Sequence, residues 1–491
     1  MKSIVVVNNP KDWNLETDNV EVVSARSYLT ESRFAETKGV RIYNLCRSYR
    51  YQAIGYYVSL LAEARGQRAF PNVATIQDIK LQTIVRVISD DLDDLIQKSL
   101  SKIKSDEFVL SIYFGQNMAH QYEKLASQLY NLFQAPLIRA NFSFNNKKWI
   151  LQNISPVPVN EVPEKHKTFL EDSAEKYFSK KRISSAKISR AKYDMAILVN
   201  PEEDEPPSNA KAIKHFIKAG EELEIRCELI TKDDYNHIPE FDALFIRETT
   251  AVNHHTYRFS RRAFTEGLVV IDDPHSILQC TNKVYLAEAL AKAKIPGPKT
   301  VIVHKDNIES LTGELDFPIV LKQPDSSFSQ GVVKADNKTQ LNQEVENLLE
   351  LSDLIIAQEF TYSDFDWRIG ILDKQPLFAC KYFMAKDHWQ IYNWKKNNDD
   401  HYGEYESIPI YDVPHKILKT ALKAANLIGD GLYGVDLKQI GNEVFVIEIN
   451  DNPTIDAGVE DSIMKEHLYL TIMKSFKDRL ENIKQVKELH L

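Results

Sequence analysis

Two β-type runs near the end of the chain, in LYGVDLKQIGNEVFVIEIN, constrain the fold more tightly than any other stretch. They cover 433–440 and 444–450 and flank a Gly-Asn pair that is typical of hairpin turns. Because side chains alternate between the two faces of a strand, Glu448 and Asn450 share one face, and the apolar residues that alternate with them share the other. The sequence therefore predicts a hairpin with one apolar face and one face that carries a carboxylate and an amide.

The length of the turn decides which residue of the first run joins Glu448. A two-residue turn would pair Asp436 with Ile447 and place the Asp436 carboxylate on the apolar face. A three-residue turn that includes Glu443 places Asp436 opposite Glu448. We predict this register, or an equivalent one that contains a bulge, because it gathers Asp436, Glu448 and Asn450 in one cluster.

Oxygen ligands of this kind suit a hard divalent cation. Two carboxylates and an amide carbonyl favour Mg²⁺ or Mn²⁺ over zinc. Mg²⁺ is usually held by one or two carboxylates, and waters and substrate phosphates fill its other positions. Asp436, Glu448 and Asn450 are therefore our candidate metal ligands. The alternative is a polar, water-facing end of a hairpin.

A lysine and a loop of small residues offer a partner for phosphate. In FPIVLKQPDSSFSQGVVK an apolar strand ends on Lys322, and the loop that follows contains Ser326, Ser327 and Gly331. A lysine at the end of a strand can act as a point charge for phosphate, and backbone N–H groups of such a loop can close over it. The alternative is an ordinary hairpin loop.

Two further stretches complete a candidate nucleotide site. Lys283 begins a predicted helix that IPGP stops. In LIIAQEFTYSDFDWRIGIL a strand ends in Gln358, Glu359 and Phe360, and Asp366 opens the next strand. We call Gln358, Glu359 and Phe360 the hinge. We predict that the hinge offers backbone groups to a purine and that Asp366 accepts hydrogen bonds from ribose hydroxyls.

The chain is long enough for two or three domains, since it has 491 residues. We predict an α/β domain over 1–154 and, over 155–192, a linker that contains three prolines and a basic helix. From 193 to 280 strands and helices alternate, which predicts a parallel sheet with covering helices. Residues 281–491 have α+β character, so the fold class is α/β and α+β, multidomain.

Composition excludes several classes of protein. Hydrophobic residues make up 43% and charged residues 27% of the chain, and the net charge is −9, which argues against a nucleic-acid-coating protein. The four cysteines lie far apart and suggest a reducing compartment. No apolar run is long enough to span a bilayer, and the N-terminal apolar run is too short for a signal peptide. We expect a cytoplasmic protein that does not bind membranes.

Lys283, Lys322 with its loop, the Gln-Glu-Phe hinge, Asp366 and the Asp-Glu-Asn cluster occur in this order. As an ordered set they resemble the RimK-like ATP-grasp enzymes, a branch of carboxylate–amine ligases that includes α-L-glutamate ligases. The resemblance covers roughly 190–475. It implies a Rossmann-like pre-ATP-grasp domain over 193–280 and an ATP-grasp domain over 281–491, and residues 1–154 resemble an extra domain that precedes the ATP-grasp core in long RimK-like proteins.

The resemblance also implies an activity and further site residues. Lys283 and Lys322 would neutralise the phosphates of ATP, and Arg368, Lys381 and Asn393 would face the γ-phosphate and the transferred group. A substrate carboxylate would take the γ-phosphoryl group, and an amine would attack the acyl phosphate to give an amide. The implied partners are amino acids or peptides, with glutamate as one candidate.

The sequence departs from the family pattern in three places. The phosphate loop has one glycine where the family has more, and Ile391 stands where an arginine is usual, so that Lys381 or Lys395 is the candidate replacement. The tail after Asn450 is rich in carboxylates, which hints at a cationic acceptor; they are Asp451, Asp456, Glu460 and Asp461.

Other interpretations stay open at this point. The same site could serve an ATP-dependent phosphotransferase or a non-catalytic ATP-binding module. We expect a substrate role for Arg247, which ends a strand near the cleft, and we expect His254 and His255 to be surface residues. The identity of both substrates and the oligomeric state, a homo-oligomer included, are not fixed by the sequence.

Overall fold

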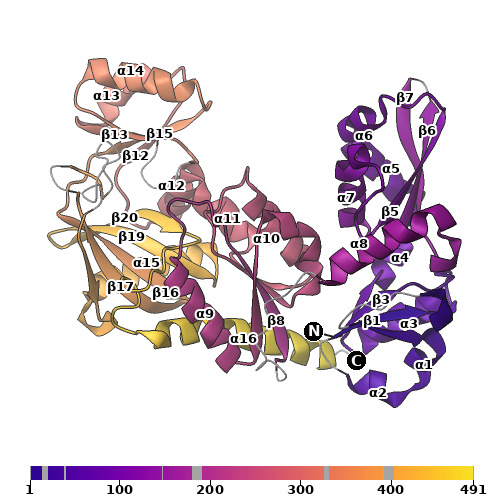
Figure 1. Ribbon diagram of the computed structural model, residues 1–491. Coiled ribbons are helices and arrows are strands. Elements are labelled where there is room, and N and C mark those ends of the chain that lie inside the picture. The colour runs from indigo at the N-terminus through magenta and orange to yellow at the C-terminus, as the bar shows by residue number, and fades with distance from the viewer. Residues whose placement is uncertain are drawn as a thin grey trace. The chain divides into compact units, whose positions relative to one another are not determined.

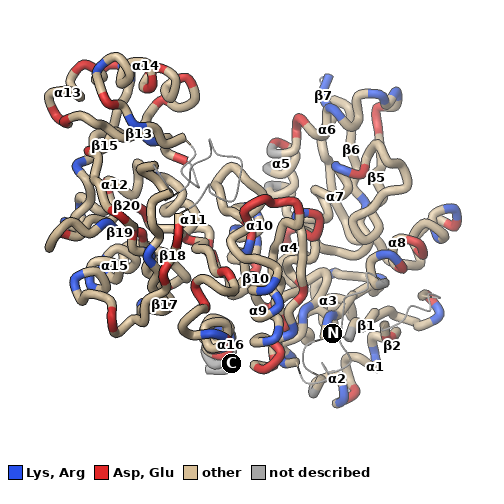
Figure 2. Tube along the Cα trace, turned by 60° about the vertical axis from the view of Figure 1, so that its left-hand side comes forward, with Lys and Arg blue, Asp and Glu red and all other residues tan. Residues whose placement is uncertain are grey.

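The computed structural model describes residues 2–13, 20–37, 40–145, 147–179, 191–325, 331–385, 388–391 and 403–489. The chain forms two compact units, Met1–Lys187 and Ile188–Leu491. Figure 2 shows acidic and basic residues interspersed along the traces of both units. Among the described residues, no helix combines the length and the apolar character needed to cross a membrane.

The first unit begins with a parallel sheet of order β2-β1-β3-β4. Its strands are β1 (Lys2–Val7), β2 (Val20–Ser24), β3 (Val40–Asn44) and β4 (Arg68–Phe70). Its helices are α1 (Ala25–Thr30), α2 (Ser32–Glu36), α3 (Ile54–Ala64) and α4 (Val73–Asp78). Ile4 and Val6 pack against α1 and α3, whereas Val5 and Val7 face a second core, so both faces of the sheet are buried.

An antiparallel sheet of order β5-β6-β7 completes the first unit. It consists of β5 (Glu107–Tyr113), β6 (Leu137–Asn145) and β7 (Lys148–Pro156). Its helices are α5 (Gln82–Asp91), α6 (Asp93–Leu100) and α7 (Glu123–Leu132), which share one core with the sheet. β6 and β7 form a hairpin, with Asn145 paired to Lys148.

The segment that we predicted as a linker, 155–192, contributes to the first unit as far as the structure describes it. Pro156 ends β7, and Val157 and Val159 are buried in the core that also contains Leu170 of α8 (Lys167–Ser179). The prolines thus start short turns that fold back on the unit, because the valines between them are apolar. Residues 180–190, which carry most of the basic charge of the predicted helix, lie outside the described residues.

The second unit starts with the predicted parallel sheet, of order β11-β10-β8-β9. Its strands are β8 (Tyr193–Leu198), β9 (Ile225–Ile230), β10 (Ala243–Ile246) and β11 (Val269–Ile271). α9 (Ala210–Glu222) begins one residue after Asn209, whose side chain caps it, and α10 (His255–Thr265) packs on the opposite face. α11 (Pro274–Thr281) follows β11.

The last helix of the chain returns to this parallel sheet. α16 (Glu466–Leu489) lies beside α9 (Figure 1), and its residues Tyr469, Met473 and Phe476 pack against Phe216 and Phe245. This contact could not be predicted from the sequence, because α9 and α16 are more than two hundred residues apart.

Two antiparallel sheets follow in the second unit. The first has the order β12-β15-β13-β14 and is covered by α14. Its strands are β12 (Thr300–Val303), β13 (Ile319–Lys322), β14 (Val332–Ala335) and β15 (Ile355–Glu359). Its helices are α12 (Lys283–Lys292), which precedes it, α13 (Leu311–Glu314) and α14 (Lys338–Leu349). Lys283 opens α12, as predicted, and Asn282 caps that helix.

The second antiparallel sheet has the order β18-β17-β16-β19-β20 and holds the predicted hairpin. Its strands are β16 (Phe365–Leu372), β17 (Gln375–Phe383), β18 (Tyr405–Ile408), β19 (Leu432–Ile440) and β20 (Glu443–Asn450). One face packs on α15 (His415–Ile428), whose C-terminal cap is Gly429. These elements confirm the predicted multidomain α/β and α+β fold class.

The hairpin reaches the predicted register by a bulge. Ile440 pairs with Glu443, so the turn contains two residues and the three-residue turn is wrong. A bulge beside Leu437 then shifts the pairing by one residue, and Asp436 lies opposite Glu448. Val444 and Val446 before the bulge and Ile449 after it are buried in the core, so the buried positions of β20 change parity at the bulge.

Candidate functional site

A pocket of about 290 Å³ in the second unit gathers most of the predicted site residues. Its walls come from both antiparallel sheets, from the start of α12 and from the loops that follow β10 and β20. The predicted residues that line it are Lys283, Lys322, Gln358, Glu359, Phe360, Asp366, Arg368, Asp436, Glu448 and Asn450. Residues from four separate stretches of sequence therefore meet around one cavity.

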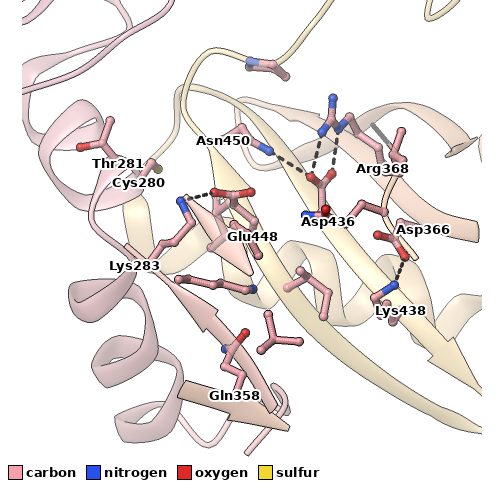
Figure 3. Close-up of a pocket in the computed structure, with 18 of the residues that line it drawn as sticks. Cys280, Thr281, Lys283, Gln358, Asp366, Arg368, Asp436, Lys438, Glu448 and Asn450 are labelled. Carbon is pink, nitrogen blue, oxygen red and sulfur yellow. Dashed lines mark hydrogen bonds and ion pairs between the residues drawn. The ribbon is translucent and has the colours of Figure 1, made fainter. Parts of the chain in front are cut away.

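Asp436 is the most constrained carboxylate of the pocket. Arg368 donates two hydrogen bonds to it, from Nε to Oδ1 at 2.7 Å and from Nη2 to Oδ2 at 2.8 Å. Asn450 Nδ2 donates to Oδ2 at 3.2 Å, so the amide and the carboxylate converge as predicted (Figure 3). Burial raises the pKa of Asp436, although the Arg368 guanidinium acts in the opposite direction. Oδ2 accepts two of these hydrogen bonds, whereas Oδ1 accepts one and keeps a further lone pair for a ligand.

Glu448 faces the lysines of the pocket. Lys283 Nζ lies 3.0 Å from Glu448 Oε1, and the Lys283 side chain is only 10% exposed. Although burial opposes ionisation, Lys283 and Lys322 lower the pKa of Glu448 below its ordinary value. Glu448 is therefore charged at neutral pH, as a metal ligand must be.

Lys322 is a partly buried lysine whose charge an anion would stabilise. Burial lowers its pKa to about 8, and the nearby Glu448 acts against that shift. Its ammonium group is therefore held at the cost of desolvation. An anionic phosphate group beside it would supply the compensating charge.

The hinge residues are held by the sheet β12-β15-β13-β14. Gln358 Nε2 donates to Thr300 Oγ1 at 2.9 Å, and Glu359 Oε1 accepts from the Lys299 backbone N–H at 3.1 Å. The Phe360 ring meets Trp389 edge-on, with ring centroids 5.8 Å apart. Gln358, Glu359 and Phe360 thus line the cavity with an aromatic residue among them, which suits a flat heterocycle.

Asp366 pairs with a lysine that sequence reasoning missed. Lys438 Nζ lies 2.7 Å from Asp366 Oδ1 and also donates to Ser363 Oγ at 2.8 Å. Lys438 stands two residues after Asp436 on β19, so the period-2 alternation of a strand was the signal that could have found it.

Several predicted residues do not line the pocket in the part of the chain that the structure describes. Lys381 pairs with Trp367 across β16 and β17, one position from Arg368, and its side chain therefore lies on the opposite face of the sheet. Its Nζ lies 3.1 Å from Glu406, so the predicted place facing the γ-phosphate is wrong. Gly331 has a φ of +67° and packs beside Gln323. Ser326, Ser327, Asn393 and Lys395 lie outside the described residues.

Most carboxylates of the acidic tail serve the fold. Glu460 accepts from the Tyr382 hydroxyl and from the Asp456 backbone N–H, and Asp461 accepts from the Gly458 backbone N–H. Asp451 alone of the four named tail carboxylates lines the pocket, where burial raises its pKa to about 7. We inferred a cationic acceptor from four carboxylates, but only one of them lies at the pocket.

Arg247 has a structural place rather than the expected substrate-facing one. It is 1% exposed, and its guanidinium donates to Ser208 Oγ, Asn452 Oδ1 and the carbonyl oxygens of two prolines. These bonds join the loop after β20 to the loop before α9. A cation at the end of a buried strand can thus satisfy backbone oxygens instead of a ligand.

Comparison with known proteins gives two family matches. Residues 25–173 match the RimK-like ATP-grasp N-terminal domain, and residues 280–466 match the RimK-like ATP-grasp domain. Together the two matches cover more than half of the chain.

Individual relatives have low sequence identity to this chain. The α-aminoadipate–LysW ligase LysX of Saccharolobus solfataricus is 27% identical over 195 residues, which are 38% of this chain and 67% of the relative. A probable α-L-glutamate ligase of Vibrio vulnificus is 24% identical over 233 residues, 47% of this chain and 74% of the relative. Among solved structures, the D-alanine–D-alanine ligase of Bacillus anthracis aligns with a TM-score of 0.46 and 15% identity over 60% of this chain and 99% of its own. With both domain matches in their expected order, the chain belongs to the RimK-like ATP-grasp family.

Proposed function

We propose that this protein is an ATP-dependent carboxylate–amine ligase that joins an amino acid to an acceptor through an amide bond. The observation that carries the proposal is the single pocket in which two lysines, an aromatic hinge and the Asp436–Glu448–Asn450 cluster meet. The named relatives, which are ligases for α-aminoadipate or glutamate, support an amino acid as one substrate.

The nucleotide would lie along the pocket from the hinge to the cluster. Gln358, Glu359 and Phe360 would border the adenine, and Asp366, oriented by Lys438, would accept from the ribose hydroxyls. Lys283 and Lys322 would neutralise the phosphates. Ser326, Ser327 and Gly331 stay predictions for the phosphate loop.

The donor set of the cluster fits a hard cation. Asp436, Glu448 and Asn450 present oxygen atoms on one face of β19 and β20, and two positive side chains already balance the carboxylates. Mg²⁺ or Mn²⁺, when bound there, would neutralise charge on the β- and γ-phosphate oxygens. These three residues are our proposed metal ligands.

The reaction would proceed in two steps. A substrate carboxylate oxygen attacks the γ-phosphorus, and the bond to the ADP oxygen breaks. The amine nitrogen then attacks the acyl carbon, phosphate leaves with the C–O electron pair, and the nitrogen loses a proton. Arg368, held between Asp436 and Thr454, would face the transferring group, and Asn393 stays a prediction for the same role. The work of these residues is positioning and charge stabilisation.

We further propose a cytoplasmic location and no nucleic-acid or membrane partner. All four cysteines are free thiols in the structure, and three of them are buried. Thiols kept in this form are typical of a reducing compartment.

The test is product analysis. The full-length protein is incubated with Mg²⁺, ATP and a panel of amino acids and peptides, beside Glu448→Ala. We expect one ADP and one phosphate for each product whose mass equals two substrates less one water, and none of these from the variant. A phosphorylated substrate without an amide would instead establish a phosphotransferase. Calorimetry separates a missing acceptor from a wrong site, because a wild-type protein that fails to bind Mg²⁺–ATP would refute the pocket.

A further inference from the structure

The loop between β10 and α10 brings two histidines to a buried glutamate. Glu248 follows β10, His254 precedes α10 and His255 is its first residue. Each of the three offers one ligand atom, and these atoms all lie within 4.8 Å of one another. His254 and His255 were predicted to be surface residues, but both are partly buried and Glu248 is 2% exposed.

The three side chains already converge. His255 Nε2 lies 2.9 Å from Glu248 Oε2, and the His255 side chain is 15% exposed. The His254 and His255 rings lie with their centroids 3.9 Å apart. Ligands of a tetrahedral zinc ion stand about 3.5 Å apart when each bond is about 2.1 Å, so side-chain rotation alone could close the set.

A second observation points to a missing ligand. Glu248 Oε1 is buried and has no hydrogen-bond partner among the described residues. A buried carboxylate oxygen without a partner is costly, whereas a bound cation would satisfy it. The contact between His255 and Glu248 Oε2 leaves this second oxygen unexplained.

We propose that Glu248, His254 and His255 form a site for a divalent cation of the zinc class. The two imidazoles are borderline ligands, and together with one carboxylate they suit Zn²⁺ or Co²⁺ better than Mg²⁺. The site is therefore chemically distinct from the all-oxygen cluster on β19 and β20. For His255 Nε2 to bind the ion, the proton that it shares with Glu248 moves to Nδ1 or to solvent.

The ion would fix one wall of the pocket. Thr249, Thr250 and Ala251 lie between the proposed ligands in sequence and line the pocket. Thr250 Oγ1 donates to Asp451 Oδ2 at 2.8 Å, so the loop also positions a pocket carboxylate. The site would thus anchor the loop from the side away from the cavity, as a structural ion does.

Zinc titration of the full-length protein, first treated with a chelator, tests the site. Calorimetry is run on wild type, His254→Ala, His255→Ala and Glu248→Gln. The matched control is His237→Ala, because His237 lies 2.7 Å from the buried Glu240 and has a side-chain exposure of 13%, without a second histidine in the contact. We expect one zinc per wild-type and control chain, an affinity loss of at least tenfold in each ligand variant, and no displacement by excess Mg²⁺.

A spectroscopic readout keeps the proposal testable if one variant folds poorly. Co²⁺ in a tetrahedral site gives a visible absorption band, which we expect in wild type and His237→Ala and not in the ligand variants. No zinc binding by the wild type, or equal binding by the wild type and all three ligand variants, would overturn the proposal. Both readouts are independent of ligase activity, so a failure here leaves the proposed function standing.

Discussion

The two faces of the sheet β18-β17-β16-β19-β20 use neighbouring residues in opposite ways. On one face Arg368, Asp436 and Glu448 form charged contacts around the pocket. On the other face Ile369 and Val435 are fully buried against α15. Adjacent residues of one strand therefore lie on opposite faces, one charged and lining the pocket and the next in the hydrophobic core, because the side chains of a strand alternate.

A charged side chain on the core face of this sheet has to reach the sheet edge to keep its charge near solvent. Lys381 emerges on the core face, where its Nζ lies 5.1 Å from the centroid of Phe365 and 5.3 Å from that of Trp367. It reaches Glu406 at the sheet edge instead of the pocket. The aliphatic part of a lysine side chain can cover apolar surface while its charge stays near solvent. Position in the strand, and not residue type, therefore decides whether a cation belongs to the site.

The largest effect is expected on the pocket face. Glu448→Gln should lower the rate of ADP formation by at least about 100-fold, because it removes a charged ligand of the proposed metal ion, which would stabilise the charge of the reacting phosphates. Glu443→Gln, on the same strand but at its exposed start, is the control and should stay within about threefold of wild type. Steady-state ADP release measures both, and equal rates for the two variants would break the distinction between the strand's positions.

The core face should respond in stability instead. Ile369→Ala should cost roughly 2–5 kcal/mol, since it leaves a cavity next to α15. The measurement is the midpoint of thermal unfolding by calorimetry, taken for the transition that Mg²⁺–ATP shifts. At temperatures below that transition, nucleotide affinity should be unchanged. A weakened nucleotide affinity with an unchanged midpoint would show that the two faces are not separable.

The pH dependence of nucleotide binding sharpens the assignment of Lys322. Its pKa of about 8 means that the free protein loses the ammonium charge as the pH rises through that value. A phosphate favours the protonated form, so affinity should fall as the pH rises through about 8 and be roughly tenfold lower at pH 9. Lys322→Arg keeps its charge and should remove this step in calorimetric titrations. A step that survives the substitution would belong to another group.

The smallest effect is expected for Lys381. Its ion pair with Glu406 is partly solvent-exposed, at 23% for the Lys381 side chain and 54% for that of Glu406, so Lys381→Ala should change stability by less than about 1 kcal/mol. ADP formation should remain within about threefold of wild type because the side chain lies away from the pocket. A loss comparable to that of Glu448→Gln would return Lys381 to the site.

Local sequence patterns were enough to predict the strands, the start of α12 at Lys283 and the pairing of Asp436 with Glu448. Alternation and capping act over a few residues, and they are legible in one sequence. The turn length was wrong because a two-residue turn with a bulge and a three-residue turn bring the same residues together. Sequence does not distinguish these solutions, since both keep the buried face apolar.

Tertiary neighbours were not predictable in the same way. The return of α16 to α9, the structural bonds of Arg247 and the convergence of His255 on Glu248 all join distant or non-periodic positions. No period marks such contacts, so a single sequence gives them no signal. The acidic tail shows the same limit, because Glu460 and Asp461 resemble site carboxylates until their hydrogen bonds are seen.

We propose that the charged face of this sheet holds a metal ion and that this ion holds ATP. The most direct test of this proposal is the calorimetric affinity for a non-hydrolysable ATP analogue, with and without Mg²⁺, in wild type and Glu448→Gln. We expect Mg²⁺ to tighten binding at least about tenfold in wild type and to have no effect in the variant, whose metal-free affinity should be equal or better because Lys283 loses its carboxylate partner. An undiminished effect of Mg²⁺ in Glu448→Gln would show that Glu448 is not a ligand of the ion.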